Sequence, residues 1–314
     1  MSATPATRAG AATGLAALAL VVNAFVWGTS WWPFRWLQAE GLHPLWATAL
    51  IYIVAAVTIV AARPRAIGLV LRTPALWIIV IASGTTNAAF NWAVVIGDVV
   101  RVVLLFYLMP VWAAVLARLL LGERFSLAAT ARTALALAGA AIVLWPETVD
   151  GQPAVALLDR FPLPRSLPDW LGVVGGFSFA LNNVMLRREA ARPEEGRALA
   201  MFVGGAAVAG ALAAVLAARG QLPWPPAAAP GWLLPALALA VAFLLANLAL
   251  QYGAARLPAN RTSVVMLTEV MFASASAVAL GGGTLTTKVG LGGALIVASA
   301  VLAALTPADS HQGP

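Results

Sequence analysis

The 314-residue sequence contains no cysteine, and charged residues make up only 10% of it. The absence of cysteine excludes disulfides, thiolate chemistry and cysteine-ligated metal sites. The two histidines, His43 and His311, are too few and too far apart to hold a metal ion together. The sequence also lacks the Gly-x-x-x-x-Gly-Lys-Ser/Thr phosphate loop, which disfavours ATP-driven pumping by this chain. We therefore expect neither a metal ion nor a cofactor.

Long apolar segments make up most of the sequence. Hydrophobic residues account for 61% of the sequence and the mean hydropathy is +0.89. A helix needs about 20 apolar residues to cross the hydrocarbon core of a bilayer. These segments are apolar nearly all round, unlike the amphipathic helices of a water-soluble domain. The sequence predicts an all-α membrane protein with ten transmembrane helices, at residues 16–37, 44–62, 74–96, 98–121, 127–145, 168–188, 197–218, 231–254, 259–281 and 287–305.

The basic residues are scattered singly between these segments despite a net charge of +7. They form no phosphate-binding face, so the expected surroundings are the lipid bilayer and not nucleic acid. Cytoplasmic loops are enriched in Lys and Arg. With the amino terminus inside, 13 of the 19 Lys and Arg residues fall on the inner side and six on the outer. We therefore expect a multi-pass protein with both termini in the cytoplasm.

The start of the chain allows a second interpretation. Arg8 followed by the apolar residues 9–22 has the charge and the apolar core of a secretory signal peptide. However, the apolar segment continues through residues 23–28 without a small-residue cleavage site. We expect a first helix that is retained.

The longest polar interruption, residues 146–168, divides the ten segments into five and five. Asn87 and Asn91 in the third segment have counterparts in Asn247 and Gln251 of the eighth. Because five is odd, the second half enters the membrane from the opposite side, as in the inverted repeats of many secondary transporters. The predicted units are a first five-helix repeat, an outer polar loop, a second five-helix repeat and a cytoplasmic tail, at 14–146, 147–167, 168–305 and 306–314.

Six of the predicted helices place an amide, an aromatic ring or a carboxylate near the middle of the bilayer. Unpaired polar groups are costly in lipid, so these groups should face other helices or a water-filled path. One interpretation is hydrogen bonding between helices, worth about 0.6–2 kcal/mol each. The other, which we favour, is a shared central cavity. The candidate substrate-binding residues are Asn23, Trp27, Trp31, Asn87, Asn91, Trp92, Tyr107, Phe179, Asn182, Asn183, Asn247, Gln251 and Glu269.

Two charged residues allow several roles. A charged Glu269 facing lipid near the bilayer centre would cost about 2.5–3.5 kcal/mol. It could couple transport to protons, contact a substrate ammonium group, or act as a neutral hydrogen-bonding acid. Arg101, at the outer end of the fourth segment, could attract a substrate carboxylate or extend its side chain to the membrane surface.

Three segments resemble the drug/metabolite transporter superfamily in its EamA-like ten-helix form: residues 23–31 (NAFVWGTSW), 108–126 (LMPVWAAVLARLLLGERFS) and 177–188 (FSFALNNVMLRR). The sequence is most similar to the YddG-type aromatic amino acid exporters of bacterial inner membranes. It departs from the family pattern in the second half. Val270 replaces a proline after Glu269, and Gly281-Gly282-Gly283 replaces a Gly-Glu-Arg.

The resemblance implies two inverted five-helix repeats around a central cavity and a secondary transporter that works by alternating access. The implied substrates are aromatic and apolar amino acids or related metabolites, exported across the bacterial inner membrane. An alternative is an exporter of lipophilic cationic drugs or of another small metabolite. A membrane-embedded enzyme would need clustered histidines, acids or a nucleophile, and the sequence shows none. The exact substrate, proton coupling and oligomeric state stay open.

Overall fold

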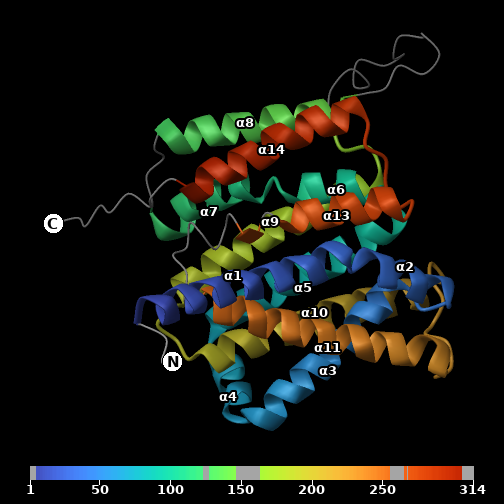
Figure 1. Ribbon diagram of the computed structural model, residues 1–314. Helices are drawn as coiled ribbons and strands as arrows, with labels where there is room; N and C mark the ends of the chain where they lie inside the picture. The colour runs from blue at the N-terminus through green and yellow to red at the C-terminus, as the bar shows by residue number, and fades with distance from the viewer. Residues whose placement is uncertain (1–4, 123–126, 146–162, 255–264, 267, 306–314) are drawn as a thin grey trace, which may run out of the picture.

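The computed structural model describes residues 5–122, 127–145, 163–254, 265–266 and 268–305, and these residues form helices without strands. Most of the helices lie side by side with their axes in roughly the same direction (Figure 1). They are α1 (Pro5–Thr29), α2 (Trp31–Ala39), α3 (Pro44–Ala62), α4 (Arg65–Arg72), α5 (Pro74–Ile96), α6 (Val99–Phe106), α7 (Met109–Leu121), α8 (Leu127–Leu144), α9 (Leu167–Arg188), α10 (Glu194–Ala218), α11 (Pro230–Ala254), α13 (Thr268–Ala279) and α14 (Thr287–Leu305).

The bundle has two distinct ends. At one end α1 begins, α14 ends and α4 lies across (Figure 1). We call it the basic end, because many arginines lie at its helix termini: Arg63, Arg65, Arg72, Arg118, Arg187, Arg188, Arg192 and Arg197. The opposite end, which we call the α2 end, contains α2 and the turns before α6 and α14.

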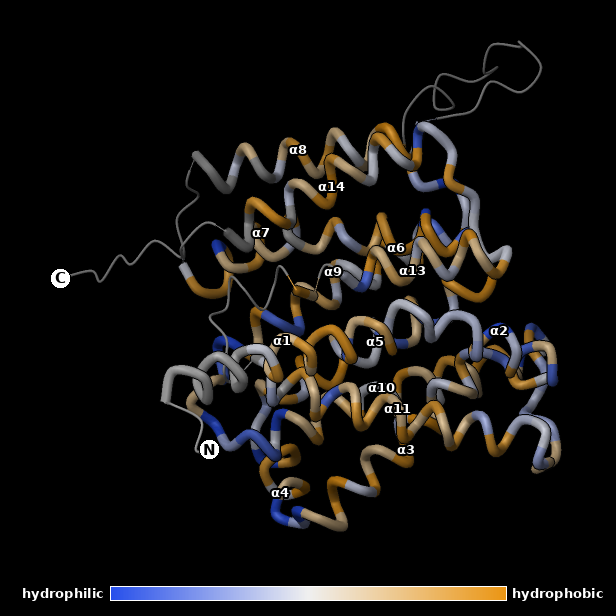
Figure 2. The backbone as a smooth tube through the Cα atoms, in the orientation of Figure 1, coloured by the Kyte–Doolittle hydropathy of each residue, from blue (hydrophilic) through white to orange (hydrophobic). Residues whose placement is uncertain are grey.

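Several outer helices present apolar side chains to their surroundings. Figure 2 shows hydrophilic residues gathered mainly at the two ends, with apolar residues along the outer helices between them. Large hydrophobic side chains are exposed on these outer faces, among them Leu18, Ile53, Val57, Leu234, Leu245 and Leu248. A water-soluble protein would cover such surface, whereas a bilayer matches it.

Six helical stretches are long and apolar enough to cross a membrane: Gly14–Ala39, Pro44–Ala62, Pro74–Ile96, Val99–Leu121, Glu194–Ala218 and Pro230–Leu250. Three more apolar helices are shorter within the described residues, at Thr133–Val143, Thr268–Ala279 and Thr287–Ser299. Helix α9 has the length, but it carries Asp169 near its start and Arg187 and Arg188 at its end. The total of ten transmembrane helices therefore stays a prediction.

The structure divides each of two predicted helices, 16–37 and 98–121, into two shorter helices. The first divides into α1 and α2 at Ser30, and the second into α6 and α7 at Tyr107 and Leu108. A proline follows each break, Pro33 in α2 and Pro110 in α7. Proline lacks the amide hydrogen that continues a helix, which explains both breaks. By contrast, the predicted ends of α3 and α5, each of which begins with a proline, are confirmed.

The helix contacts follow a regular scheme. Helix α5 packs on α9 and α10, and α11 packs on α1 and α3. Helices α6 and α7 pack on α9, and α13 packs on α1. The remaining large contacts join α3 to α10 and α8 to α14. If α1, α3, α5, α6–α7 and α8 are matched in order with α9, α10, α11, α13 and α14, the contacts of α5 with α9 and α10 correspond to those of α11 with α1 and α3. The contacts of α6 and α7 with α9 correspond to that of α13 with α1, and the α3–α10 and α8–α14 contacts correspond to themselves.

Glycines bring α5 and α10 into close contact. A Cβ atom on Gly204 would lie 2.1 Å from the Val80 carbonyl oxygen, and one on Gly84 would lie 2.3 Å from the Gly204 carbonyl oxygen. Small residues of this kind let helix backbones approach in membranes, where packing replaces the hydrophobic effect.

We predict that Gly204→Ala lowers the free energy of unfolding by about 1–3 kcal/mol, because the added methyl group meets backbone and not a movable side chain. Gly290→Ala in α14 is the matched control, since nothing lies within 4 Å of its Cβ position. Thermal unfolding of the purified protein in detergent measures both. Equal melting temperatures for the two variants would contradict the close packing of α5 on α10.

Candidate substrate cavity

A cavity of about 370 Å³ lies in the middle of the bundle. Its lining residues on α9, α10, α11 and α13 come from the halves of those helices nearer the basic end. Nine of the predicted substrate-binding residues line it: Asn23, Trp27, Asn87, Tyr107, Phe179, Asn182, Asn183, Asn247 and Glu269. These nine residues, from five helices and one interhelical turn far apart in the sequence, therefore meet at a single space.

Three predicted residues do not line this cavity. Trp31, beyond the α1–α2 break, is buried, and its Nε1 donates to Ser276 Oγ at 2.9 Å. Asn91 is buried one turn nearer the α2 end than Asn87, and its Nδ2 donates to Thr48 Oγ1 at 3.0 Å. Trp92 contacts the His43 ring edge-on, with centroids 5.5 Å apart. The side chain of Gln251 lies outside the described residues.

Several residues that line the cavity were not predicted from the sequence, and Tyr52 is the most informative of them. Its hydroxyl donates to Asn87 Oδ1, and Asn87 Nδ2 donates to the Ser83 carbonyl oxygen at 2.8 Å. A phenol near the middle of a predicted transmembrane helix was an available signal. Thr86, Phe90, Met109, Met201, Phe202 and Leu250 also line the cavity, but nothing in their spacing distinguishes them from core residues.

Aromatic rings form two walls of the cavity. On one side Trp27 of α1 stacks on Phe243 of α11, with centroids 4.6 Å apart and planes at 14°. On the other side Phe106 lies 4.8 Å from Phe90 and 5.4 Å from Phe179, centroid to centroid. Such rings offer flat apolar faces with little conformational freedom to lose.

The break between α6 and α7 brings a phenol to the one acidic group among the described lining residues. Tyr107 is the C-cap of α6, and its hydroxyl donates to Glu269 Oε2 at 3.3 Å. Glu269 lies in the first turn of α13. The cavity thus combines aromatic walls, amide groups and one carboxylate.

The α2 end of the cavity is closed by packed apolar side chains. Trp31, Val94, Val100, Val103 and Ala277 belong to one buried cluster, which also includes the cavity residues Phe90, Phe106 and Tyr107. This cluster separates the cavity from the polar contacts at the α2 end.

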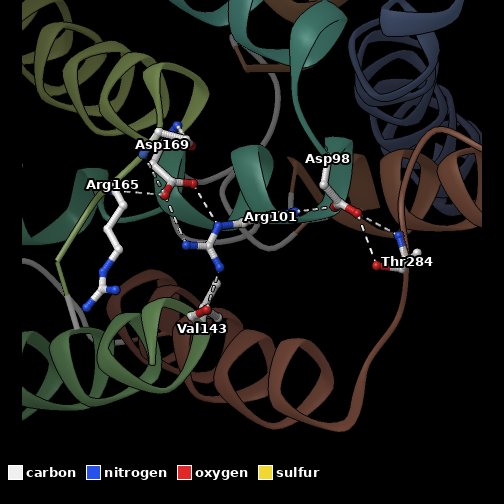
Figure 3. A network of polar contacts seen from close by, with 7 residues as sticks. Asp98, Arg101, Val143, Arg165, Asp169 and Thr284 are labelled. Atoms are coloured by element: carbon white, nitrogen blue, oxygen red, sulfur yellow. Dashed lines mark hydrogen bonds and ion pairs between the residues drawn. The ribbon is translucent and has the colours of Figure 1, made fainter. Parts of the chain in front are cut away.

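Arg101 forms a bidentate ion pair at this end (Figure 3). Its Nε lies 2.7 Å from Asp169 Oδ1, its Nη2 lies 3.0 Å from Asp169 Oδ2, and its Nη1 donates to the Val143 carbonyl oxygen at 2.8 Å. Asp169 also forms a capping box with Ser166 at the start of α9. The guanidinium is therefore engaged in joining α6, α8 and α9, which explains its position better than a substrate contact or a free surface side chain.

Asp98 connects the two halves of the chain at the same end (Figure 3). Its Oδ1 accepts from the Arg101 amide at 2.9 Å, and its Oδ2 accepts from the Thr284 amide at 2.6 Å. The Val99 amide donates to the Gly282 carbonyl oxygen at 3.0 Å, and Arg35 Nη2 donates to the same oxygen at 3.2 Å. We call Arg35, Asp98, Gly282 and Thr284 the latch.

Glycine is required in the turn before α14, which carries the latch residues Gly282 and Thr284. Gly281 has φ +70°, in the left-handed region that favours glycine. A Cβ atom on Gly282 would lie 2.4 Å from the Trp31 ring. The glycine run that departs from the family pattern thus allows the turn before α14 to lie against Trp31 and Asp98.

Comparison with known proteins agrees with this arrangement. Residues 14–145 match the model of the EamA-like transporter family. No curated protein matches the chain. A solved structure described as "Crystal structure of protein" is 21% identical, with a TM-score of 0.53, and the match covers 92% of this chain and 95% of the other. The fold is thus shared over nearly the whole chain, and residues 14–145 form an EamA-like domain of the drug/metabolite transporter superfamily.

This domain points to a multi-pass membrane transporter with a small-molecule substrate in a lipid environment, not to an enzyme. The part of the chain that the structure describes contains no group of three His, Cys, Asp or Glu residues suited to a metal ion.

We predict that Asp169→Asn lowers the free energy of unfolding by about 1.5–3 kcal/mol, because it weakens charged hydrogen bonds of Arg101. Glu189→Gln is the matched control at the other end of α9. It also removes one carboxylate, but its partner Arg192 is 50% exposed, and such pairs contribute about 0–1 kcal/mol. Melting temperatures in detergent distinguish them, and a larger loss for Glu189→Gln would contradict this account.

Proposed function

We propose that the protein is a secondary transporter that exports aromatic and other apolar amino acids, or related metabolites, by alternating access. The observation that carries this proposal is the cavity between Trp27–Phe243 and Phe90–Phe106–Phe179, with amide groups between these aromatic walls. Its volume of about 370 Å³ lies within the range of about 300–1,000 Å³ that is usual for small-molecule sites.

The repeat supports the alternating-access part of the proposal. We propose that 14–146 and 168–305 are inverted repeats, joined by the outer loop 147–167 and followed by the cytoplasmic tail 306–314. The exchange symmetry of the helix contacts supports this division, because it places equivalent helices around one axis. Rocking of one repeat against the other would then open the cavity to each side in turn.

The charge distribution supports the export part of the proposal. We propose that the basic end faces the cytoplasm of a bacterial inner membrane, because Lys and Arg concentrate on the cytoplasmic side. The lining residues on α9, α10, α11 and α13 lie nearer this end, and the apolar cluster and the latch lie toward the other. A substrate would therefore enter from the cytoplasm in this conformation. Export of lipophilic cationic drugs is the second candidate, which Glu269 favours.

We predict that proteoliposomes containing the protein take up labelled tryptophan or phenylalanine, and that Trp27→Leu reduces the flux at least about fivefold. Losing one stacked ring wall lowers substrate affinity by about 1–3 kcal/mol. Trp77→Leu is the matched control, since Trp77 lies on the outside of α5 and is 44% exposed. Absence of flux for every amino acid tested would reject the proposal.

The latch gives a second test, which concerns the conformational change. Opening the α2 end requires the turn before α14 to leave Asp98. Asn caps a helix as well as Asp does. Asp98→Asn therefore keeps an acceptor for the Arg101 amide, but it places an NH₂ group against the Thr284 amide.

We predict that Asp98→Asn increases exposure of the cavity from the α2 end. The chain has no cysteine, so Asn247→Cys introduces a single thiol into the cavity. A membrane-impermeant maleimide applied from the α2 side should label it about tenfold faster after Asp98→Asn, since a charged hydrogen bond is worth about 1.5–3 kcal/mol. Glu189→Gln, at the basic end, should leave the rate unchanged. An unchanged rate in Asp98→Asn would show that the latch does not restrain opening.

A further inference from the structure

Two buried amide oxygens at the cavity lack a hydrogen-bond donor. Asn23 Nδ2 donates to the Ala246 carbonyl oxygen at 2.8 Å, which fixes the amide so that Oδ1 is the remaining group. That oxygen has no partner among the described residues, and neither has Asn182 Oδ1. Both residues are at least 98% buried, and both line the cavity. A buried acceptor without a donor costs free energy, so a ligand that donates hydrogen bonds here would relieve that cost.

Asn23, Asn182 and Glu269 line the same cavity, and neighbouring contacts connect them. Gly28 of α1 packs against the backbone of Glu269, and Asn23 precedes it by five residues, about 7.5 Å of helix rise. Tyr107 donates to Glu269, and its neighbour Phe106 packs on Phe179, one turn before Asn182. The polar region of the cavity is therefore formed by acceptors from α1, α9 and α13.

The same cavity offers no cation to an anionic group. Among the described residues that line it there is no arginine, lysine or histidine. The hydroxyl of Tyr107 already donates to Glu269, and that of Tyr52 already donates to Asn87. Arg101 and Arg35, two of the arginines at the α2 end, are held by Asp169 and by backbone carbonyl groups. A carboxylate in the cavity would lose hydration without gaining an ion pair.

We infer that the cavity recognises a primary ammonium group joined to an aromatic ring by a short alkyl chain, and that it does not require a carboxylate. The inference rests on the proposed transport function and specifies its substrate class. The ring lies between the aromatic walls, and the three N–H groups of the ammonium meet Asn23, Asn182 and Glu269. Arylalkylamines should therefore bind at least as well as the corresponding amino acids, and arylalkyl carboxylates without an amine should be rejected.

Four compounds that share the indole ring test this inference. Tryptamine carries only the ammonium, tryptophan carries both groups, 3-indolepropionate carries only the carboxylate, and tryptophol carries a neutral hydroxyl. We expect tryptamine to inhibit labelled tryptophan flux in proteoliposomes at concentrations no higher than unlabelled tryptophan does. We expect 3-indolepropionate to need at least about ten times more. Equal inhibition by 3-indolepropionate and tryptamine overturns the inference while the transport proposal stands.

Two variants connect the preference to these residues. Glu269→Gln keeps an acceptor for Tyr107 and removes the charge, and Asn182→Leu removes one free acceptor at similar volume. Each should reduce the ratio of tryptamine affinity to tryptophol affinity, by about tenfold for Glu269→Gln. A merely structural role would lower both affinities together and leave the ratio unchanged, which would overturn the assignment. Thermal shifts by the four compounds give a readout independent of flux. If tryptophan gives neither flux nor a shift, the proposed function itself fails.

Discussion

Every polar group inside this bundle must find its partner within the protein, because lipid offers none. The groups that succeed hold helices together. Asp169 binds Arg101 across α6 and α9, and Asn91 binds Thr48 across α3 and α5. Asn23 Oδ1 and Asn182 Oδ1 belong to residues that line the cavity, and they have no donor among the described residues. Asn91 Oδ1, away from the cavity, also has no donor among the described residues, so a place at the cavity is needed as well to mark the candidate binding residues.

Proline and glycine shape the site through the backbone. Pro110 ends α6 early, so that Tyr107 caps that helix and reaches Glu269 instead of continuing along it. Glycines at the α5–α10 contact remove side chains where these backbones meet, which keeps the aromatic rings of the cavity in a small volume. Gly282 does the same at the α2 end, where the latch turn lies on Trp31.

Hydropathy predicted the helices well, since apolar length and an initial proline define α3 and α5 directly. Helical spacing also predicted the helix face that includes Asn87. Spacing tells which way a side chain points from the helix axis, but it does not tell whether the cavity extends to that level along the axis. Asn91 shares that direction and lies four residues, about 6 Å, farther along, where its Nδ2 donates to Thr48. The pairing of Arg101 with Asp169 joins residues 68 positions apart, which no local pattern can show. For the same reason, ring spacing alone could not distinguish Phe90 or Phe202 from core residues.

The distribution of charge also determines what transport would cost. Arginines lie at the ends of the bundle, and Glu269 is the one carboxylate among the described residues of the cavity. A zwitterion crosses without electrical work, whereas moving one uncompensated positive charge outward against a potential that is negative inside costs about 2.3 kcal/mol per 100 mV. An ammonium group and a proton would compete for the same oxygen atoms of Glu269. If each departing ammonium is replaced there by an entering proton, the net charge moved is zero, and a site without a cation can export amines without opposing the membrane potential.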